Sequence, residues 1–102
     1  MKKLALLASG TGSNVRNIIE YFKESKDVIV DCVIVNRKEA GALDHAKSGN
    51  IAGFVFYKDD FNDKTVLNLL KERGVTHIIL AGFLLKIPDV IINAYSKEII
   101  NV

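Results

Sequence analysis

Short apolar runs alternate with amphipathic segments along the whole chain, and this alternation is the feature that most restricts its fold. Five runs are rich in aliphatic and β-branched residues, and they cover residues 3–8, 28–35, 52–57, 77–81 and 98–102. Near-continuous apolar runs of this length are typical of strands that are covered on both faces. The alternation with helices predicts an α/β fold: a Rossmann-like, doubly wound parallel sheet of about five strands with helices on both faces.

The four segments between these runs have the apolar spacing and boundary residues of helices. In the first, Val15, Ile18, Ile19 and Phe22 share one helical face. The expected boundaries are an N-cap at Ser13, a second helix over residues 39–48, a third between an N-cap at Asn62 and an end at Gly74, and a fourth with Pro88 in its first turn.

Length, charge and cysteine content limit the classes of function. At 102 residues the chain is expected to form one domain. Its formal net charge of +2 is small and both signs are interspersed, so we expect no nucleic-acid partner and no membrane surface. The single cysteine, Cys32, lies in an apolar run and is expected to be a buried structural thiol. With no signal peptide or membrane span after Met1, a cytoplasmic location is expected.

No residue pattern in the sequence predicts a metal site. The cysteine and the two histidines lack the spacing of metal ligands. Asp59, Asp60 and Asp63 lie close together but do not have the spacing of a calcium loop. Acidic residues before a helix are better explained by the positive end of the helix dipole.

A turn of glycines and small polar residues, Ser9-Gly10-Thr11-Gly12-Ser13-Asn14, joins the first run to the first helix. The start of a helix carries backbone N–H groups without partners, and it attracts anions. Glycines allow a ligand to approach the backbone closely, and hydroxyl and amide side chains add hydrogen bonds. The turn is therefore a candidate phosphate site. The alternative is that the glycines only make a tight connection between strand and helix.

The known phosphate motifs fit this turn only in part. The dinucleotide pattern G-x-G-x-x-G begins with Gly10 and Gly12 but has Val15 in place of its third glycine. Arg37 stands near the position of the usual acidic partner and could receive a 2′-phosphate, so an NADP-binding module stays open as an alternative. The P-loop pattern does not match. A single phosphate monoester fits the short turn better than a dinucleotide.

Three segments together resemble the phosphoribosylglycinamide formyltransferase family: SGTGSN at residues 9–14, LAGFLLKI at residues 80–87 and IINV at residues 99–102. The similarity runs in register over the whole chain. It implies an enzyme of purine synthesis that transfers a formyl group from 10-formyltetrahydrofolate to glycinamide ribonucleotide. The resemblance also implies the fold expected above.

The resemblance assigns roles to individual residues. The phosphate of the ribonucleotide is expected to bind the main chain of the turn, at Gly10, Thr11, Gly12, Ser13 and Asn14. The folate is expected to contact Lys64, Leu84, Leu85, Lys86 and Ile87. Asn101 matches the asparagine of the family's catalytic N-x-H motif and is the expected catalytic residue.

The same resemblance predicts an incomplete enzyme. The motif continues to a histidine one position beyond Val102, and its acidic partner comes later in the family. Residues 1–102 are therefore expected to be a single N-terminal domain without the C-terminal catalytic half, and to be inactive alone. His45 and His77 are expected to have structural or surface roles. The last strand is expected to be an uncovered edge that pairs with another copy or with the missing half. The competing readings are a stand-alone nucleotide-binding module and a small NADP-dependent domain.

Overall fold

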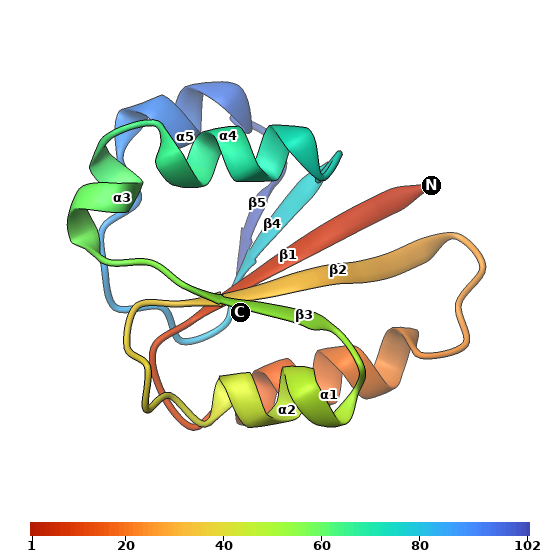
Figure 1. Ribbon diagram of the computed structural model, residues 1–102. Helices are drawn as coiled ribbons and strands as arrows, with labels where there is room; N and C mark the ends of the chain where they lie inside the picture. Colours follow the sequence, from red (N-terminus) through yellow and green to blue (C-terminus); the bar gives the residue numbers. More distant parts are fainter.

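The structure, a computed structural model, describes residues 1–102 and confirms the parallel α/β fold. Five strands form one sheet in the order β3-β2-β1-β4-β5, and each neighbouring pair is parallel (Figure 1). The strands are β1 (Lys2–Ala8), β2 (Val28–Val35), β3 (Ala52–Val55), β4 (His77–Leu80) and β5 (Ile99–Asn101). All five lie within or close to the apolar runs of the sequence.

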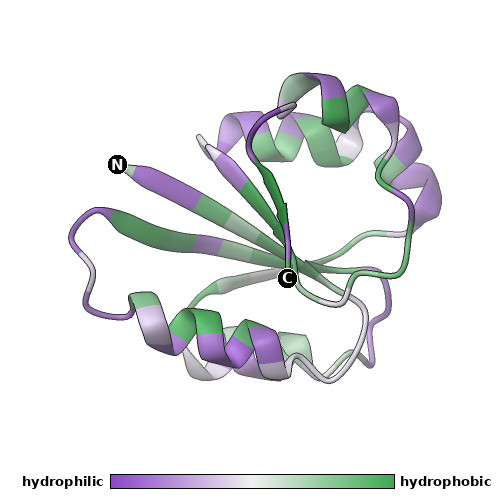
Figure 2. Ribbon diagram, turned by 180° about the vertical axis from the view of Figure 1, so that it is seen from behind, coloured by the Kyte–Doolittle hydropathy of each residue, from purple (hydrophilic) through white to green (hydrophobic).

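Helices cover both faces of the sheet. On one face lie α1 (Ser13–Phe22) and α2 (Ala42–Ser48), and on the other lie α3 (Lys58–Asn62), α4 (Thr65–Glu72) and α5 (Asp89–Ala94) (Figure 1). Side chains of β1 point alternately to the two faces: Leu4 and Leu6 join the core under α1 and α2, whereas Ala5 and Leu7 join the core under the other helices. Figure 2 shows the sheet interior mostly in the hydrophobic colour, while the helices alternate between the two colours.

The helix starts differ from the sequence predictions. Gly12, not Ser13, is the N-cap of α1, and its backbone is left-handed, with a φ of 81°. No side chain caps this helix. The second helix begins at Ala42 rather than at residue 39. Asn62 ends the separate helix α3 instead of capping the third expected helix, whose N-cap is Lys64. The reason is Asp63, whose extended backbone (ψ −162°) interrupts the helical path.

The acidic residues of this region act as helix caps. The carboxylate of Asp60 accepts the N–H of Tyr57 at 2.9 Å, and that of Asp63 accepts the N–H of Thr65 at 2.8 Å. This hydrogen bond lowers the pKa of Asp63. The positions agree with the prediction that these acids serve helix starts. No group of three or more His, Cys, Asp or Glu side chains in the chain is arranged to hold a metal ion.

The strand order has a switch point beside β1. The chain leaves β1 toward α1 on one face, and it leaves the neighbouring β4 toward α5 on the opposite face. In open α/β sheets, ligands bind in the crevice that such diverging loops leave at the carboxyl ends of the strands. The loops after β1 and β4 therefore border the region where a site is expected. None of the helices has the length and apolar character that crossing a membrane requires.

Candidate functional site

The loop after β1 is shaped by close packing against α2. Gly12 has a positive φ, and a Cβ there would lie 2.5 Å from the Cα of Ala42. Gly10 differs, because a Cβ on it would meet nothing within 4 Å. The need for a tight connection between strand and helix therefore explains why residue 12 is glycine, but it does not explain why residue 10 is glycine.

The backbone N–H groups of residues 10–15 have no hydrogen-bond acceptor within the protein. The first amide of this region with a partner is that of Arg16, which donates to the carbonyl of Gly12 at 2.8 Å. The side chains of Thr11, Ser13 and Asn14 are exposed and add hydroxyl and amide groups beside these donors. A run of unpaired donors at the positive end of α1 can hold an oxyanion such as a phosphate.

Two hydrogen bonds tie this loop to the loop after β4. The N–H of Ser9 donates to the carbonyl of Gly82 at 3.2 Å, and the N–H of Leu84 donates to Oγ of Ser9 at 2.9 Å. Ser9 is 1% exposed, so its hydroxyl is one of the few buried polar groups. Gly82 turns the chain with a φ of 75°. The two loops of the switch point thus form one hydrogen-bonded unit.

The segment after Gly82 borders a cavity with α3. Leu85, Lys86 and Ile87 line this cavity of about 370 Å³ together with side chains of α3 and the start of α5: Lys58, Phe61, Asn62, Pro88 and Asp89. The backbone N–H groups of residues 85–87 have no acceptor in the protein. The cavity therefore offers main-chain hydrogen bonds next to apolar surface, which suits a flat heteroaromatic ligand.

Two of the residues expected near the folate lie outside this cavity. Leu84 is 79% exposed and directs its N–H toward Ser9. Lys64 is exposed between α3 and α4 and does not line the cavity. The basic residue from this part of the chain that does line it is Lys58.

Asn101 is the last residue of β5 and lies at the same edge of the sheet. It is in register with Leu80 of β4, whose carbonyl accepts the N–H of Val102 at 3.1 Å. Val102 shares a small cavity with Asn14 of α1. Asn101, the turn after β1 and the loop after β4 therefore converge at the carboxyl ends of the strands.

Of the two histidines, only His45 lies near the turn after β1. His77 begins β4 at the opposite end of the sheet, with its Nδ1 2.8 Å from Oγ1 of Thr76. His45 belongs to α2, which packs on β2 and β3, and so lies on the far side of β1 from β5. It is half-buried rather than exposed as expected, and it lines a polar cavity of about 410 Å³ with Gly10, Thr11 and Arg37. Arg37 in turn pairs with Glu39 at 3.5 Å.

Cys32 is fully buried in the sheet, as predicted. Burial raises the pKa of its thiol to about 12, and the neighbouring charge of Asp31 adds to this effect. A buried thiol with a raised pKa is a poor nucleophile, which agrees with the structural role expected for Cys32.

Sequence reasoning gave no individual role to several residues of the site, among them Ser9, Lys58 and Asn62. Ser9 carried a usable signal, because it is the first polar residue after an apolar strand at a point where two loops must meet. Lys58 and Asn62 carried none, because they reach the cavity only through the packing of α3 against the segment at residues 85–87.

A family model described as formyl transferase matches residues 2–102. Among curated proteins, the chloroplastic phosphoribosylglycinamide formyltransferase of Arabidopsis thaliana is 34% identical, over 99% of this chain and 37% of its own length. The phosphoribosylglycinamide formyltransferase of Bacillus subtilis (strain 168) is 31% identical, over 100% of this chain and 55% of its own length.

Solved structures with similar names share the fold. Phosphoribosylglycinamide formyltransferase from Anaplasma phagocytophilum superposes with a TM-score of 0.90 at 31% identity, covering 98% of this chain and 48% of that one. Glycinamide ribonucleotide transformylase 1 from Geobacillus kaustophilus gives a TM-score of 0.90 at 32% identity, covering 99% and 57%. The chain thus spans about half, or less, of the length of these relatives.

Proposed function

The chain belongs to the formyl transferase family, and on that basis we propose that residues 1–102 are the N-terminal, ribonucleotide-binding domain of a phosphoribosylglycinamide formyltransferase. The resemblance noted in the sequence is confirmed at the level of the family. The observation that carries the proposal is the run of unpaired amides at residues 10–15, at the same sheet edge as Asn101.

The phosphate of glycinamide ribonucleotide binds the turn after β1. The amides of residues 10–14 supply the donors, and the positive end of α1 stabilises the negative charge. The side chains of Thr11, Ser13 and Asn14 add hydrogen bonds at the rim. Gly10 leaves the backbone open to the ligand, since no protein atom lies where its side chain would be.

The folate cosubstrate binds the cavity between α3 and the segment at residues 85–87. The residues there fit such a group: unpaired main-chain donors lie beside the apolar side chains of Phe61 and Ile87. 10-Formyltetrahydrofolate supplies the formyl group when bound. Leu85, Lys86 and Ile87 hold the ring system by their backbone, and Lys58 and Lys64 are the cations available for its acidic tail.

Asn101 is the one catalytic group proposed within residues 1–102. Its carboxamide can donate hydrogen bonds to a substrate oxygen that becomes negatively charged during the reaction, beside the carboxyl ends of β4 and β5. Formyl transfer also needs groups that move protons, and neither His45 nor His77 lies beside Asn101. We therefore propose that residues 1–102 bind substrate without turning it over, and that purified chain shows no formyl transfer. The buried free thiol of Cys32 suits a reducing compartment such as the cytoplasm.

A titration with three ligands separates this proposal from the NADP-binding alternative. Glycinamide ribonucleotide, inorganic phosphate and NADPH are added in turn to ¹⁵N-labelled chain, and amide shifts are followed. The ribonucleotide is expected to shift the amides of residues 10–15 at the lowest concentration. Tighter binding of NADPH, with shifts at Arg37, would favour the alternative.

The matched variants for this titration are Gly10→Ala and Arg37→Ala. Gly10→Ala puts a methyl group into the open space over the loop, so it should weaken ribonucleotide binding about tenfold or more, by analogy with a lost charge-assisted contact. Arg37→Ala should leave it unchanged. Equal affinity of wild-type protein and Gly10→Ala would contradict the proposed phosphate site.

A further inference from the structure

A large cavity runs along α1 and α2 toward the end of the sheet opposite to the candidate site. It measures about 970 Å³, against about 370 Å³ for the cavity beside residues 85–87. Its walls come from α1, the loop between α1 and β2, the start of β2 and the end of α2. A volume of this size lies within the range of small-molecule sites. The proposed function makes no use of this region, which we name the α1–β2 cavity.

The floor of the α1–β2 cavity is apolar. It is formed by Ile19 and Phe22 of α1, Val28 of β2 and Ile51 before β3. These four side chains pack against the core under α1 and α2, but each is only partly buried. An apolar group placed on them would remove further hydrocarbon surface from water, which is favourable.

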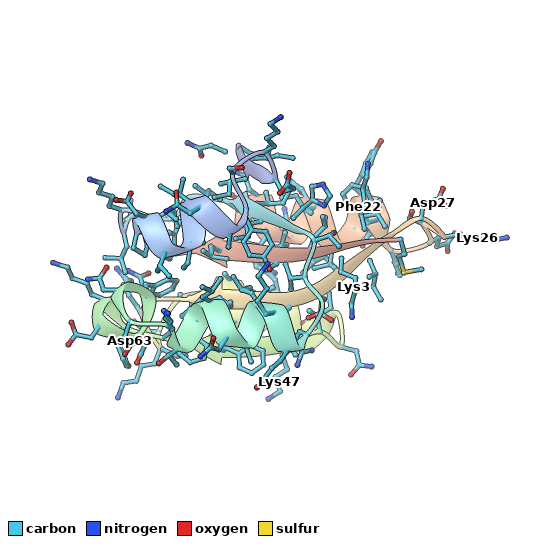
Figure 3. All side chains as sticks on the ribbon, turned by 90° about the horizontal axis from the view of Figure 1, so that it is seen from above. Lys3, Phe22, Lys26, Asp27, Lys47 and Asp63 are labelled. Carbon is cyan, nitrogen blue, oxygen red and sulfur yellow. The ribbon has the colours of Figure 1, made fainter.

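The rim of the cavity is positively charged. Arg16, Lys23 and Lys26 line it, and Glu20 is the only carboxylate that does. None of these four side chains takes part in an ion pair, since the salt bridges of the chain involve other residues. Figure 3 shows Phe22 and Lys26 at the same end of the molecule, opposite to Asp63. Asp27 lies beside Lys26 on the loop but does not line the cavity.

An excess of unpaired cations over an apolar floor selects one kind of ligand. A neutral apolar molecule would leave the cations unused, and a hydrophilic anion would leave the floor exposed to water. We propose that the α1–β2 cavity binds a small amphipathic anion, with an aliphatic body on Ile19, Phe22, Val28 and Ile51 and a carboxylate near Arg16 and Lys23. None of residues 9–14, 85–87 and 101 lines this cavity, so its ligand is tested separately from the proposed function, although Arg16 and His45 also lie close to the turn after β1.

Binding is tested by adding sodium decanoate to ¹⁵N-labelled chain, with 1-decanol as the neutral probe of equal chain length. Decanoate is expected to shift the amides of Ile19, Phe22, Val28 and Ile51 in a saturable way, and decanol is expected to bind more weakly. Absence of saturable shifts would overturn the proposal. So would shifts centred on Ile100 and Val102, which are exposed apolar residues elsewhere, or equal affinities for the two probes.

Charge-reversal variants test the role of the rim. Lys23→Glu and Arg16→Glu change exposed side chains, so both proteins should fold. Each is expected to weaken decanoate binding about fivefold or more while leaving decanol binding unchanged, because each removes one ion pair and adds repulsion. Lys97→Glu, an equal charge change outside the cavity, is the matched control and should bind decanoate as the wild-type protein does. Equal weakening in all three variants would show a general charge effect and contradict the proposal.

Discussion

The N–H of Leu84 donates a hydrogen bond to the buried hydroxyl of Ser9 over 2.9 Å, although 75 positions separate the two residues. This bond joins the loop after β1, which carries the unpaired amides, to the loop after β4, which leads into the cavity at residues 85–87. This hydroxyl therefore helps to hold the two expected binding regions together, alongside the bond from the N–H of Ser9 to the carbonyl of Gly82.

Ser9→Ala is expected to lower the free energy of unfolding by about 1–2 kcal/mol, because it leaves the amide of Leu84 without an acceptor. The same variant should increase hydrogen exchange at Leu84. Ser13→Ala is the matched control in the same turn, since Ser13 caps no amide, and it should change stability by less than about 0.5 kcal/mol. Urea unfolding measures both, and equal effects of the two variants would refute the role of Ser9.

The two glycines of the turn are expected to respond differently to alanine. Gly12→Ala should cost about 2 kcal/mol or more, because its φ is 81° and the new methyl group would lie 2.5 Å from the backbone of Ala42. Gly10→Ala should stay within about 0.5 kcal/mol of the wild-type value, because no atom lies within 4 Å. Thermal unfolding of both variants is the measurement. Similar losses would mean that the loop is not held as described.

Asp31 and Arg73 form a half-buried ion pair that fastens the end of α4 to β2. Nε of Arg73 lies 2.6 Å from Oδ2 of Asp31, whose side chain is 12% exposed. Asp31→Asn is expected to cost about 1–2 kcal/mol, because the guanidinium keeps its charge and loses its ionised acceptor. Glu39→Gln is the control: the Arg37–Glu39 pair is largely exposed and should contribute less than about 0.5 kcal/mol. Chemical denaturation of the two variants checks the difference.

Stability is expected to fall at alkaline pH because of Cys32. Burial raises the pKa of this thiol from 9.0 to about 12, so the unfolded chain releases the proton at a lower pH than the folded one. Between these values the unfolded state binds fewer protons, and the free energy of unfolding falls as pH rises, by up to about 1.4 kcal/mol per pH unit. Below pH 9 this contribution is constant.

Other groups also titrate at high pH, such as Tyr95, whose pKa is likewise raised by burial. The variant Cys32→Ala separates the contribution of Cys32 from theirs. The variant is expected to be less stable at neutral pH because it leaves a small cavity, but to lose less stability between pH 9 and pH 11. Urea unfolding across this pH range gives both slopes. Parallel curves for the two proteins would contradict the assignment to Cys32.

The free edge of β5 is expected to mediate association between copies of the chain. β5 has a neighbour only on its β4 side, and Ile100 and Val102 are 48% and 57% exposed. Unpaired edges with apolar side chains recruit other strands. Sedimentation velocity should show a mass that rises with concentration, and Ile100→Lys should suppress the rise. A monomer at every concentration would rule out this association.

The sequence by itself determined the elements and their class. The apolar runs at residues 28–35 and 77–81 are strands because aliphatic residues fill most of their positions, and Gly74 ends α4 with a positive φ as its local pattern predicts. The turn at residues 9–14 was also recognisable, because a strand, two glycines and a helix start follow one another along the chain. Such features depend on neighbours within a few residues, so a single sequence contains them.

Only the tertiary structure decided which distant residues meet. The pairing of Ser9 with Leu84, the approach of Lys58 and Asn62 to residues 85–87, the position of His45 beside Gly10 and the α1–β2 cavity all depend on the strand order and on the face that each helix covers. Long-range contacts are set by the burial of whole elements against one sheet, and no local stretch of sequence encodes that arrangement.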